Sequence, residues 1–538
     1  DFQTGKWDIN HWVRGGCIYG VMPANGLTYA PPHSCACYID AKLNGMNALA
    51  ARQAKAPASN QPRLQHGEAY GKIPDPKSEA GNPQSDWPTY RHDPSRSGRT
   101  RSPVSTDRKP TWKTKLGGRL SSVVVAKGKV FLASIDTHTV YALYAKDGKE
   151  AGRFAADGRV DSPPTIHRGA AIFGSADGWV YCLRAADGKL AWRFRAAAHE
   201  RLISAWEQLE SAWPVHGSVL VQNGEIYCVA GRPMFLDGGM RLLRLDPKTG
   251  RVLGDAALDS LDPQTGKDLQ THIKVLNMPT ALPDVLSSDG RSVYMRTQRF
   301  NLDGTRSQVA PTSVTDQAPN GAHLFSGAGF LDGSWFHRSY FVYGKSIASG
   351  ANSWYLAGRN APAGRLMVAG DTRVYGFARK PQYYRWATPL EYHLFSSDKR
   401  PEIVSADGTK RKKARRTEKC AIPATKLAFH WSAQAPLHAR AMLLADKTLF
   451  VAGTPDVVDE EKIFKHLGDT TMKAKIAEQV DALAGRQGAI LWAASADDGR
   501  KLDEYKLDAA PVWDGMAAAN GRLYMATVDG KVTCYAGA

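Results

Sequence analysis

The sequence predicts an all-β protein built as a β-propeller. Its 538 residues include 50 Gly, 30 Pro, 14 Trp and 20 Tyr, and few long helical patterns, which is typical of a turn-rich β protein. One kind of turn, containing Asp and Gly, recurs at residues 1–6, 146–150, 186–190, 246–251 and 497–501. Where nothing interrupts it, the unit around this turn repeats about every 40 to 50 residues, the spacing of a four-stranded propeller blade.

Each turn follows a strand-like apolar stretch, such as Val140–Tyr144 or Leu242–Leu245. The turns suit tight hairpins in which some residues need positive φ. Seven or eight four-stranded blades are expected, with eight favoured, in a single domain that spans residues 1–538 and closes when the last unit pairs with the N-terminal strand. The expected units cover residues 12–51, 112–158, 159–200, 206–258, 270–345, 346–400, 425–506 and 510–538.

Four segments interrupt this pattern. Residues 52–111 are rich in Pro and polar residues and are interpreted as a connection. Apolar residues at helical spacing predict small helical insertions at 199–213 and 456–484. Residues 399–419 are strongly basic and are expected to form a surface insertion. Residue 1 falls inside a repeat, so a natural N-terminal part, with any secretion signal, is expected to be missing.

The charge balance favours acidic partners. The chain has 70 Lys and Arg against 52 Asp and Glu, a formal charge of +18. Such a charge suits acidic polysaccharides, anionic lipids or nucleic acid. The basic run 399–419 lacks the interleaved aromatics that bind single strands, so no specific nucleic acid is predicted. No apolar run reaches the ~18 residues of a transmembrane helix, so no transmembrane segment is predicted.

Seven cysteines are present, too few for a disulfide-dense scaffold. Cys35 and Cys37 lie two apart in a strand-like segment, so their side chains share a face. Together with Cys17 they are expected to form a disulfide or buried thiols, and the alternative is a soft-metal site of Cys17, His33, Cys35 and Cys37. The remaining strand cysteines, Cys182, Cys228 and Cys534, are predicted to be small core residues.

The best candidate site is an irregular stretch that begins at Ser334–Tyr343. In a propeller such a stretch can reach the central channel, where ligands usually bind. Arg side chains would bind a carboxylate or sulfate, and Tyr faces suit sugar rings. The expected ligand-binding residues are Arg338, Tyr343, Arg359, Tyr383, Tyr384, Arg385 and Tyr392. The alternative is that this stretch forms an ordinary strand whose aromatic side chains have only a structural role.

These residue types would also suit β-elimination from a uronic acid. His337 or His393 would act as the base and Tyr340 as the acid, while an Arg neutralised the carboxylate. A polysaccharide lyase-like activity is therefore one enzymatic option for this chain.

Taken with the strand pattern, the Asp-x-x-Thr-Gly-Lys turns resemble those of the quinoprotein-like (pyrroloquinoline quinone-type) β-propellers. Asp86–Gly98 is similar to the segment that precedes the first blade in many of them. That superfamily includes quinone-dependent alcohol dehydrogenases and a non-enzymatic lipoprotein that assists outer-membrane protein assembly. Trp12–Gly26 with Phe336–Tyr340 resembles large secreted propeller proteins of planctomycete-like bacteria, some with a further N-terminal domain. The resemblance implies a periplasmic or extracellular location.

The chain departs from the dehydrogenase pattern. It has no adjacent cysteines, no recognisable calcium ligand set and no Cys-x-x-Cys-His haem motif. The expected function is therefore an exported propeller that binds an acidic carbohydrate-like ligand in its central channel, with processing left open. Two alternatives remain. One is an alcohol or sugar dehydrogenase using pyrroloquinoline quinone with calcium, and the other is a non-enzymatic scaffold for envelope proteins.

Overall fold

The structure is a computed structural model. It describes residues 3–6, 13, 15, 19–31, 43, 45–51, 62–73, 85–269, 285–306, 317, 321–326, 341–345, 358, 360–383, 391–400, 402–404, 424–466 and 468–537. Within these residues, none of the helices has the length and apolar character that crossing a membrane requires.

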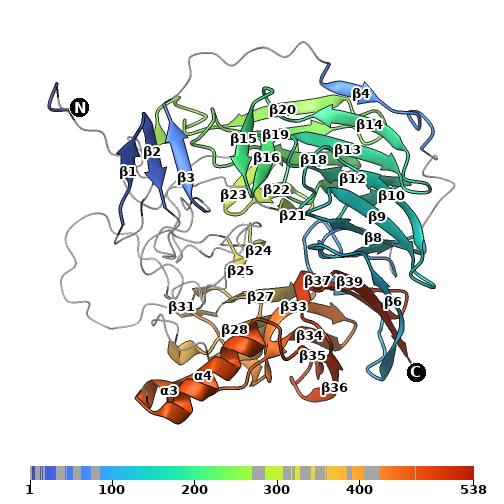
Figure 1. The fold of residues 1–538 in the computed structure, drawn as a ribbon, viewed down its shortest axis with the longest axis vertical. Coiled ribbons are helices and arrows are strands. Elements are labelled where there is room, and N and C mark those ends of the chain that lie inside the picture. Colours follow the sequence, from blue (N-terminus) through green and yellow to red (C-terminus); the bar gives the residue numbers. More distant parts are fainter. Residues whose placement is uncertain are drawn as a thin grey trace.

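Sheets of mainly antiparallel strands follow one another around a ring, as the sequence predicted (Figure 1). Six of them have four or five strands. The first two sheets consist of β7 (Val124–Ala126), β8 (Lys129–Ser134), β9 (Thr139–Tyr144) and β10 (Glu150–Ala155), and of β11 (Thr165–His167), β12 (Ala170–Gly174), β13 (Trp179–Arg184) and β14 (Leu190–Arg195) with β4 (Leu64–His66). The next two consist of β17 (Leu220–Gln222), β18 (Glu225–Ala230), β19 (Met240–Leu245) and β20 (Val252–Leu258), and of β27 (Leu366–Ala369), β28 (Arg373–Arg379), β29 (Tyr392–Asp398) and β32 (Phe429–Ala433). The last two consist of β33 (Leu437–Ala445), β34 (Thr448–Pro455), β35 (Ala489–Ser495) and β36 (Lys501–Leu507) with β5 (Arg99–Thr100), and of β37 (Pro511–Ala519), β38 (Arg522–Thr527) and β39 (Lys531–Gly537) with β6 (Arg108–Lys115).

Two further sheets have three strands each within the described residues. They are β21 (Ser287–Ser288), β22 (Ser292–Met295) and β23 (Gln298–Asn301), and β24 (His323–Ser326), β25 (Phe341–Gly344) and β26 (Ala363–Gly364). Because these two are incomplete there, the number of blades stays a prediction. Short pairs also form between β15 (Leu202–Ala205) and β16 (Gln208–Ser211), and between β30 (Glu402–Val404) and β31 (Ala424–Lys426).

The last sheet is completed by β6, which pairs with β39 beside the C-terminus (Figure 1). The expectation that residues 52–111 are only a connection is wrong for this part, as is closure by a strand at the start of the chain. β4 in the same region likewise adds a fifth strand to β14. The sequence did not indicate the start of β6 as a strand, because β6 lies at the outer edge of its sheet and its Lys109, Pro110 and Lys113 face solvent. Lysine and proline protect such an edge from pairing with other chains.

The Asp-Gly turns join sheets to one another. Trp431 Nε1 donates to the Ala496 carbonyl, 3.0 Å away, in the turn that contains Gly499. A Cβ on Gly499 would lie 2.5 Å from a Trp431 ring atom, so only glycine fits. Trp112 with Gly148 and Trp192 with Gly250 repeat this contact. The glycines of all five predicted turns have the positive φ that the sequence indicated: Gly5, Gly148, Gly188, Gly250 and Gly499.

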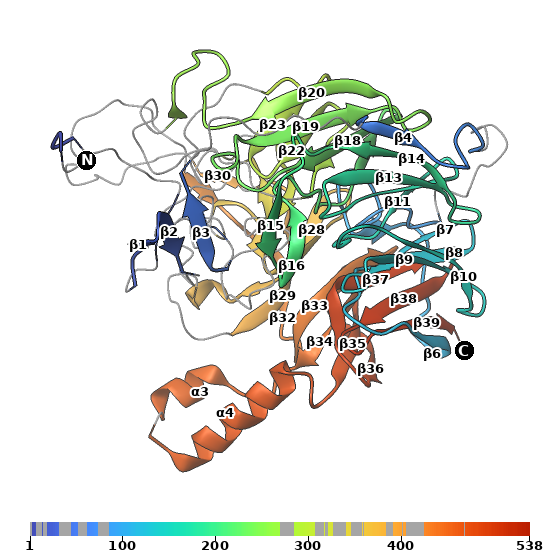
Figure 2. The ribbon, with the colours of Figure 1, turned by 45° about the horizontal axis from the view of Figure 1, so that its top comes forward.

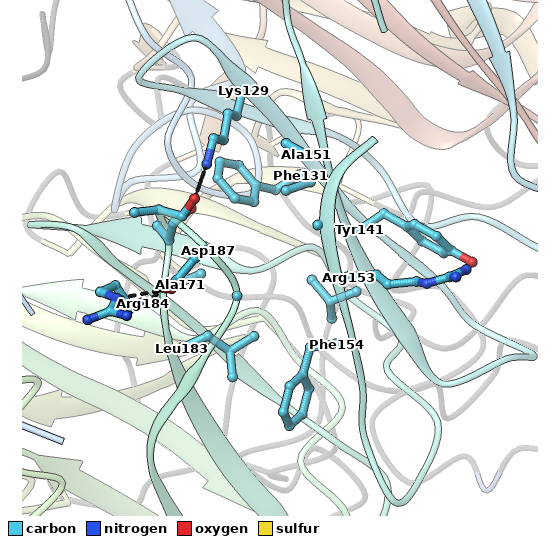
Figure 3. Close-up of a pocket in the computed structure, with 16 residues that line it drawn as sticks. Lys129, Phe131, Tyr141, Ala151, Arg153, Phe154, Ala171, Leu183, Arg184 and Asp187 are labelled. Carbon is cyan, nitrogen blue, oxygen red and sulfur yellow. Dashed lines mark hydrogen bonds and ion pairs between the residues drawn. The ribbon is translucent and has the colours of Figure 1, made fainter. Parts of the chain in front are cut away.

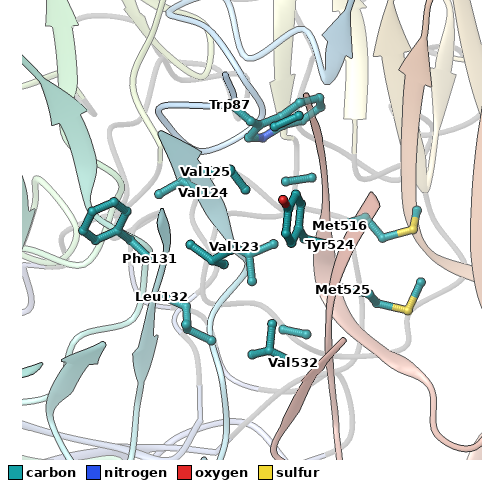
Figure 4. Packing of buried hydrophobic residues seen from close by; sticks show 14 of the residues in the cluster. Trp87, Val123, Val124, Val125, Phe131, Leu132, Met516, Tyr524, Met525 and Val532 are labelled. Carbon is teal, nitrogen blue, oxygen red and sulfur yellow. The ribbon is translucent and has the colours of Figure 1, made fainter. Parts of the chain in front are cut away.

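The core lies between neighbouring sheets. The strand of each complete sheet that is nearest the ring axis is called its inner strand: β7, β11, β17, β27, β33 and β37. Val124 and Val125 of β7 are fully buried and pack with Met516 and Tyr524 of the last sheet (Figure 4). Burying such faces against the next sheet is what stabilises a ring of otherwise two-sided sheets.

The predicted helical insertion at 199–213 is wrong, because this segment forms the β15–β16 hairpin. Its turn residues Trp206 and Glu207 both have positive φ, 52° and 65°, as a two-residue hairpin loop requires. The residues at helical spacing have no common surface to cover, since Leu202 is 62% and Leu209 69% exposed.

The insertion at 456–484 is helical as predicted, but it forms two helices, α3 (Glu460–Lys465) and α4 (Thr470–Leu483), that project from the ring (Figure 2). Asp459 and Asp469 cap their N-termini. The expected apolar face is only partly buried: Ile463 is covered, whereas Phe464 and Val480 are about half exposed.

The first predicted unit, 12–51, is described as a three-stranded sheet of β1 (Met22–Ala24), β2 (Leu27–Ala30) and β3 (Asn47–Ala50) that pairs with no other described strand. It lies beside the ring (Figure 2). Of the basic insertion 399–419, the structure describes Lys399, Arg400 and β30, and the rest is outside the described residues.

Candidate functional site

Residues 85–100, called the hub segment below, connect the inner strands across the ring axis. Trp87 exchanges two backbone hydrogen bonds with Val125 of β7, at 2.7 and 2.8 Å. Backbone carbonyls of the hub segment also accept hydrogen bonds from four further sheets, at 2.7 to 3.0 Å. The pairs are Ile166 N–H to Pro88, Ser288 N–H to Pro94, Ala369 N–H to Ser97 and Leu444 N–H to Gly98. The hub segment is therefore the one stretch of the described chain that hydrogen-bonds to so many sheets through its backbone.

Two buried arginines fix the hub segment in place. Arg91 Nη1 donates to Asp514 Oδ1 at 2.7 Å, and Tyr90 donates to the other oxygen of Asp514 at 2.8 Å. The Arg91 guanidinium also lies 4.9 Å from the centre of the Phe341 ring. Arg96 donates to the carbonyl of Leu286, 2.9 Å away. Arg91, Arg96 and Asp514 all have positive φ near 50–56°, a strained conformation that this network must hold.

The hub segment occupies one end of the ring. It meets Val125 in β7, Ala369 at the end of β27 and Leu444 near the end of β33. Residues before β27 and early in β33 therefore belong to the opposite end, about 10–20 Å away at ~3.3 Å per residue. The two ends are called the hub side and the channel side.

On the channel side, Arg365 immediately precedes β27, and its guanidinium lies 4.9 Å from the centre of the Trp513 ring in β37. The sheet that begins with β33 lies between those two sheets. Arg440 belongs to β33, at a bulge where two residues oppose one in β34. Trp513 packs against the same core as Leu437 and Ala439. Arg365, Arg440 and Trp513 therefore come from three adjacent sheets at one end of the ring.

Arg440 has an unusual environment. Its guanidinium makes no hydrogen bond or ion pair with the described residues, and its Nε is inaccessible to solvent. Burial lowers the pKa of the Arg440 side chain, and no neighbouring charge acts against this. A partly buried cation without a counterion among the described residues would gain from an anionic ligand.

Tyr392 and His438 are beside this group. The Tyr392 ring stacks on Phe377 and meets the His438 ring edge-to-face at 5.9 Å. Burial raises the pKa of Tyr392, against the opposing effect of the positive Arg365 and Arg379. His438 Nε2 lies 3.3 Å from Asp456. Of the residues predicted to bind ligand, Tyr392 is thus close to the channel-side arginines.

His393, a predicted base, is 2% exposed inside the sheet, between Phe395 and Phe429. Its Nδ1 lies 2.7 Å from the Ser432 hydroxyl. Burial, together with the charge of Lys380, lowers the His393 pKa to about 4. These contacts are those of a packing residue and do not support the predicted catalytic role.

The other predicted site residues are mostly outside the described part of the chain. This holds for His337, Arg338, Tyr340, Arg359, Tyr384 and Arg385, and for the proposed metal ligands Cys17, His33, Cys35 and Cys37. Tyr383 ends a short 3-10 helix, Pro381–Tyr383. Cys182, Cys228 and Cys534 are buried free thiols in strands, which confirms their prediction as core residues.

Tyr343, also predicted to bind ligand, lies on the hub side. It lines a cavity of about 450 Å³ between the hub segment and the ends of several strands. The polar residues that line it are His92, Asp93, Ser95, Ser97, Arg99, Arg101, Ser288, Asp289, His323, Asp371 and Lys399. Sequence reasoning missed this grouping, as it missed Arg365 and Trp513, because the residues are far apart in the chain and no local pattern joins them.

A second hollow between β9, β10 and β13 is too small to bind a ligand. Phe131, Phe154 and Leu183 line it with Lys129 and Arg153 at its edge (Figure 3). Its volume of about 20 Å³ is sufficient for about one water molecule.

In the described part of the chain, no group of three or more His, Cys, Asp or Glu could hold a metal ion. The sequence also lacks the adjacent cysteines of the quinone-dependent dehydrogenases. Whether the chain binds a quinone with calcium stays a prediction.

Comparison with known proteins agrees with the fold. Residues 93–328 match the family model described as outer membrane protein assembly factor BamB. The fold is that of a PQQ-like β-propeller, and residues 93–328 are similar to the BamB-like family model. No curated protein matches the chain, and its predicted affinity to planctomycete-like proteins stays a prediction.

Solved structures of the same kind are distant in sequence. A quinohemoprotein alcohol dehydrogenase of Pseudomonas putida is 14% identical, with a TM-score of 0.46, over 87% of this chain and 82% of that one. One from Comamonas testosteroni is 14% identical, with a TM-score of 0.43, over 84% and 80%. BamB from Moraxella catarrhalis is 10% identical, with a TM-score of 0.42, over 80% and 97%. These likenesses say nothing about activity.

Proposed function

We propose that the chain is an exported propeller that binds an acidic carbohydrate-like ligand at the channel side of the ring. The observation that carries this proposal is the guanidinium of Arg440, which is partly buried and has no partner among the described residues. A carboxylate or sulfate would supply its missing counterion through a charge-assisted pair. The description of the matched family as an outer-membrane assembly factor supports export.

The neighbouring residues suit a sugar ring. Trp513 is partly exposed, and an aromatic ring of this kind suits stacking against a sugar. Tyr392 is 5% exposed and packs beside these residues, so it would support the site without touching the ligand. Within the described residues, the roles would be charge recognition by Arg440 and stacking by Trp513.

Calorimetric titration tests the proposal. Trigalacturonate is the acidic probe, and maltotriose is a neutral one of the same length. Arg440→Gln should weaken trigalacturonate binding at least about tenfold, since a hydrogen bond to a charged group contributes ~1.5–3 kcal/mol. Arg500→Gln is the matched control, because this arginine is 73% exposed at a turn. Equal affinity of wild type and Arg440→Gln, or equal binding of both probes, would refute the proposal.

Processing of the ligand is tested separately. A lyase would release unsaturated uronate that absorbs in the ultraviolet, and a quinone-dependent dehydrogenase would reduce a dye only with added quinone and calcium. The BamB-like match favours a second candidate, a non-enzymatic envelope scaffold. A scaffold would bind neither trisaccharide and would copurify with an envelope protein.

A further inference from the structure

The hub-side cavity is formed by segments far apart in sequence. The hub segment supplies Asp93, and the turns after β21 and β27 supply Asp289 and Asp371. Tyr343 comes from β25, and Lys399 follows β29. Because the hub segment is hydrogen-bonded to the ends of these strands, the cavity has a fixed shape. Its 450 Å³ lies within the ~300–1,000 Å³ range of small-molecule sites.

All three carboxylates of the cavity are engaged by protein donors. Asp93 accepts from the Ser95 hydroxyl at 2.7 Å and from the Ser97 N–H at 3.1 Å. Burial raises the Asp93 pKa, but the bonds from His92 and from the Ser97 hydroxyl and N–H outweigh it and lower the pKa to about 2. The turn that holds Asp289 is closed by N–H groups of Arg291 and Ser292 and by the Tyr294 hydroxyl, at 2.8 to 2.9 Å.

Asp371 is engaged by arginines. Arg99 pairs with both of its oxygens, with Nη2 to Oδ2 at 2.6 Å, and Arg101 lies 3.8 Å away. Two of the three cations in the cavity are therefore used by this carboxylate. The third cation that lines the cavity is Lys399.

Lys399 has no such partner. Its ammonium makes no hydrogen bond or ion pair with the described residues, and it lies 5.3 Å from the centre of the Tyr343 ring. Its backbone N–H is held by the Thr372 carbonyl at 3.3 Å, which fixes the start of the side chain. Burial lowers the pKa of Lys399, and the nearby Asp371 partly offsets this. The cavity thus has one unpaired cation beside an aromatic ring.

Tyr343 adds a hydrogen-bond donor. Burial raises the pKa of its phenol, so the hydroxyl stays protonated at neutral pH. No described residue accepts a hydrogen bond from it. Because the carboxylates of the cavity already accept hydrogen bonds from the protein, the Lys399 ammonium and the Tyr343 phenol are the neighbouring donors left for the carboxylate of a ligand.

We propose that the hub-side cavity is a second binding site, specific for an organic carboxylate of monosaccharide size, whose carboxylate pairs with Lys399 and whose body lies against Tyr343. The site is at the other end of the ring from Arg440. It therefore does not depend on the proposed channel-side function.

Titration with galacturonate tests this assignment, with galactose as the probe that differs only by the carboxylate. Wild type should bind galacturonate and not galactose. Lys399→Gln should weaken galacturonate binding at least about tenfold, whereas Lys399→Arg, which keeps the charge, should retain most of it. Lys506→Gln, at an exposed lysine of β36, is the matched control and should bind like wild type.

The outcomes separate the two sites. Loss of galacturonate binding in Lys399→Gln and its retention in Arg440→Gln support a second site. Equal binding by wild type and Lys399→Gln, or equal binding of galactose, overturns the proposal. If Lys399→Gln does not fold, the comparison of the two sugars on wild type and the Tyr343→Phe variant decides, because loss of the hydroxyl should weaken galacturonate binding several-fold.

Discussion

Replacing Arg91 with Met should strongly destabilise the ring. The guanidinium of Arg91 is 2.7 Å from Asp514, and both side chains are only 3% exposed. Removing one partner of a buried pair leaves an uncompensated charge and typically costs about 3–5 kcal/mol. We therefore expect Arg91→Met to lower the free energy of unfolding by that amount, a large part of the ~5–15 kcal/mol of a typical domain.

Urea denaturation followed by tryptophan fluorescence measures this effect. Arg184→Met removes an exposed pair with Asp187 and should leave the midpoint unchanged. In the double variant Arg91→Met/Asp514→Asn, the buried charge is gone and Asn tolerates the positive φ at this position. The double variant should therefore be more stable than Arg91→Met alone. If it is less stable, or if Arg91→Met unfolds at the wild-type midpoint, the reasoning is refuted.

Three further predictions concern the turns and the buried titratable groups. Gly499→Ala should destabilise the protein more than Gly188→Ala. Both glycines have φ of 75°, which costs an L-residue ~1–2 kcal/mol, but only at Gly499 would the new methyl group also meet the Trp431 ring, where overpacking adds ~1–3 kcal/mol. Equal midpoints of the two variants in urea would contradict this. The His393 pKa of about 4 lies below the ordinary 6.5, so its contribution to stability is present above pH 6.5 and is lost as pH falls toward 4; an NMR titration of its ring should have a midpoint near 4, and a midpoint near 6.5 would show that the ring is solvated. Asp93, with a pKa of about 2 against 3.8, contributes above about pH 4 and loses that contribution as pH falls toward 2, so Asp93→Asn should flatten the acid side of the stability profile; an unchanged profile would show that Asp93 is not the group responsible.

The sequence by itself determined the repeat. Glycines such as Gly148 and Gly499 occur where the backbone needs positive φ. The strands around them repeat as units whose two apolar faces can be buried only when neighbouring units stack. These are local properties, so they can be recognised without knowing the partner sheet. The same holds for α3 and α4, whose caps Asp459 and Asp469 stand directly before them.

Local patterns were misleading where tertiary contacts dominate. Leu202, Trp206 and Leu209 are at helical spacing, yet the segment is a hairpin because Glu210 is held by Arg159 and Gln208 lies 2.7 Å from His138. The lysines of β6 suggested a solvated connection, although β6 completes the last sheet. In both cases a residue distant in sequence decided the structure.

The candidate sites depended on the tertiary structure almost entirely. Tyr343 and Tyr392 were both expected in one channel, but the ring places them at opposite ends, one beside Lys399 and the other beside Arg365. What makes Arg440 and Lys399 notable is the absence of a partner within the described residues, and only the folded arrangement of other chain segments reveals it. Composition indicated that a basic propeller would favour anions, whereas the packing of the sheets decided where Arg440 and Lys399 lie.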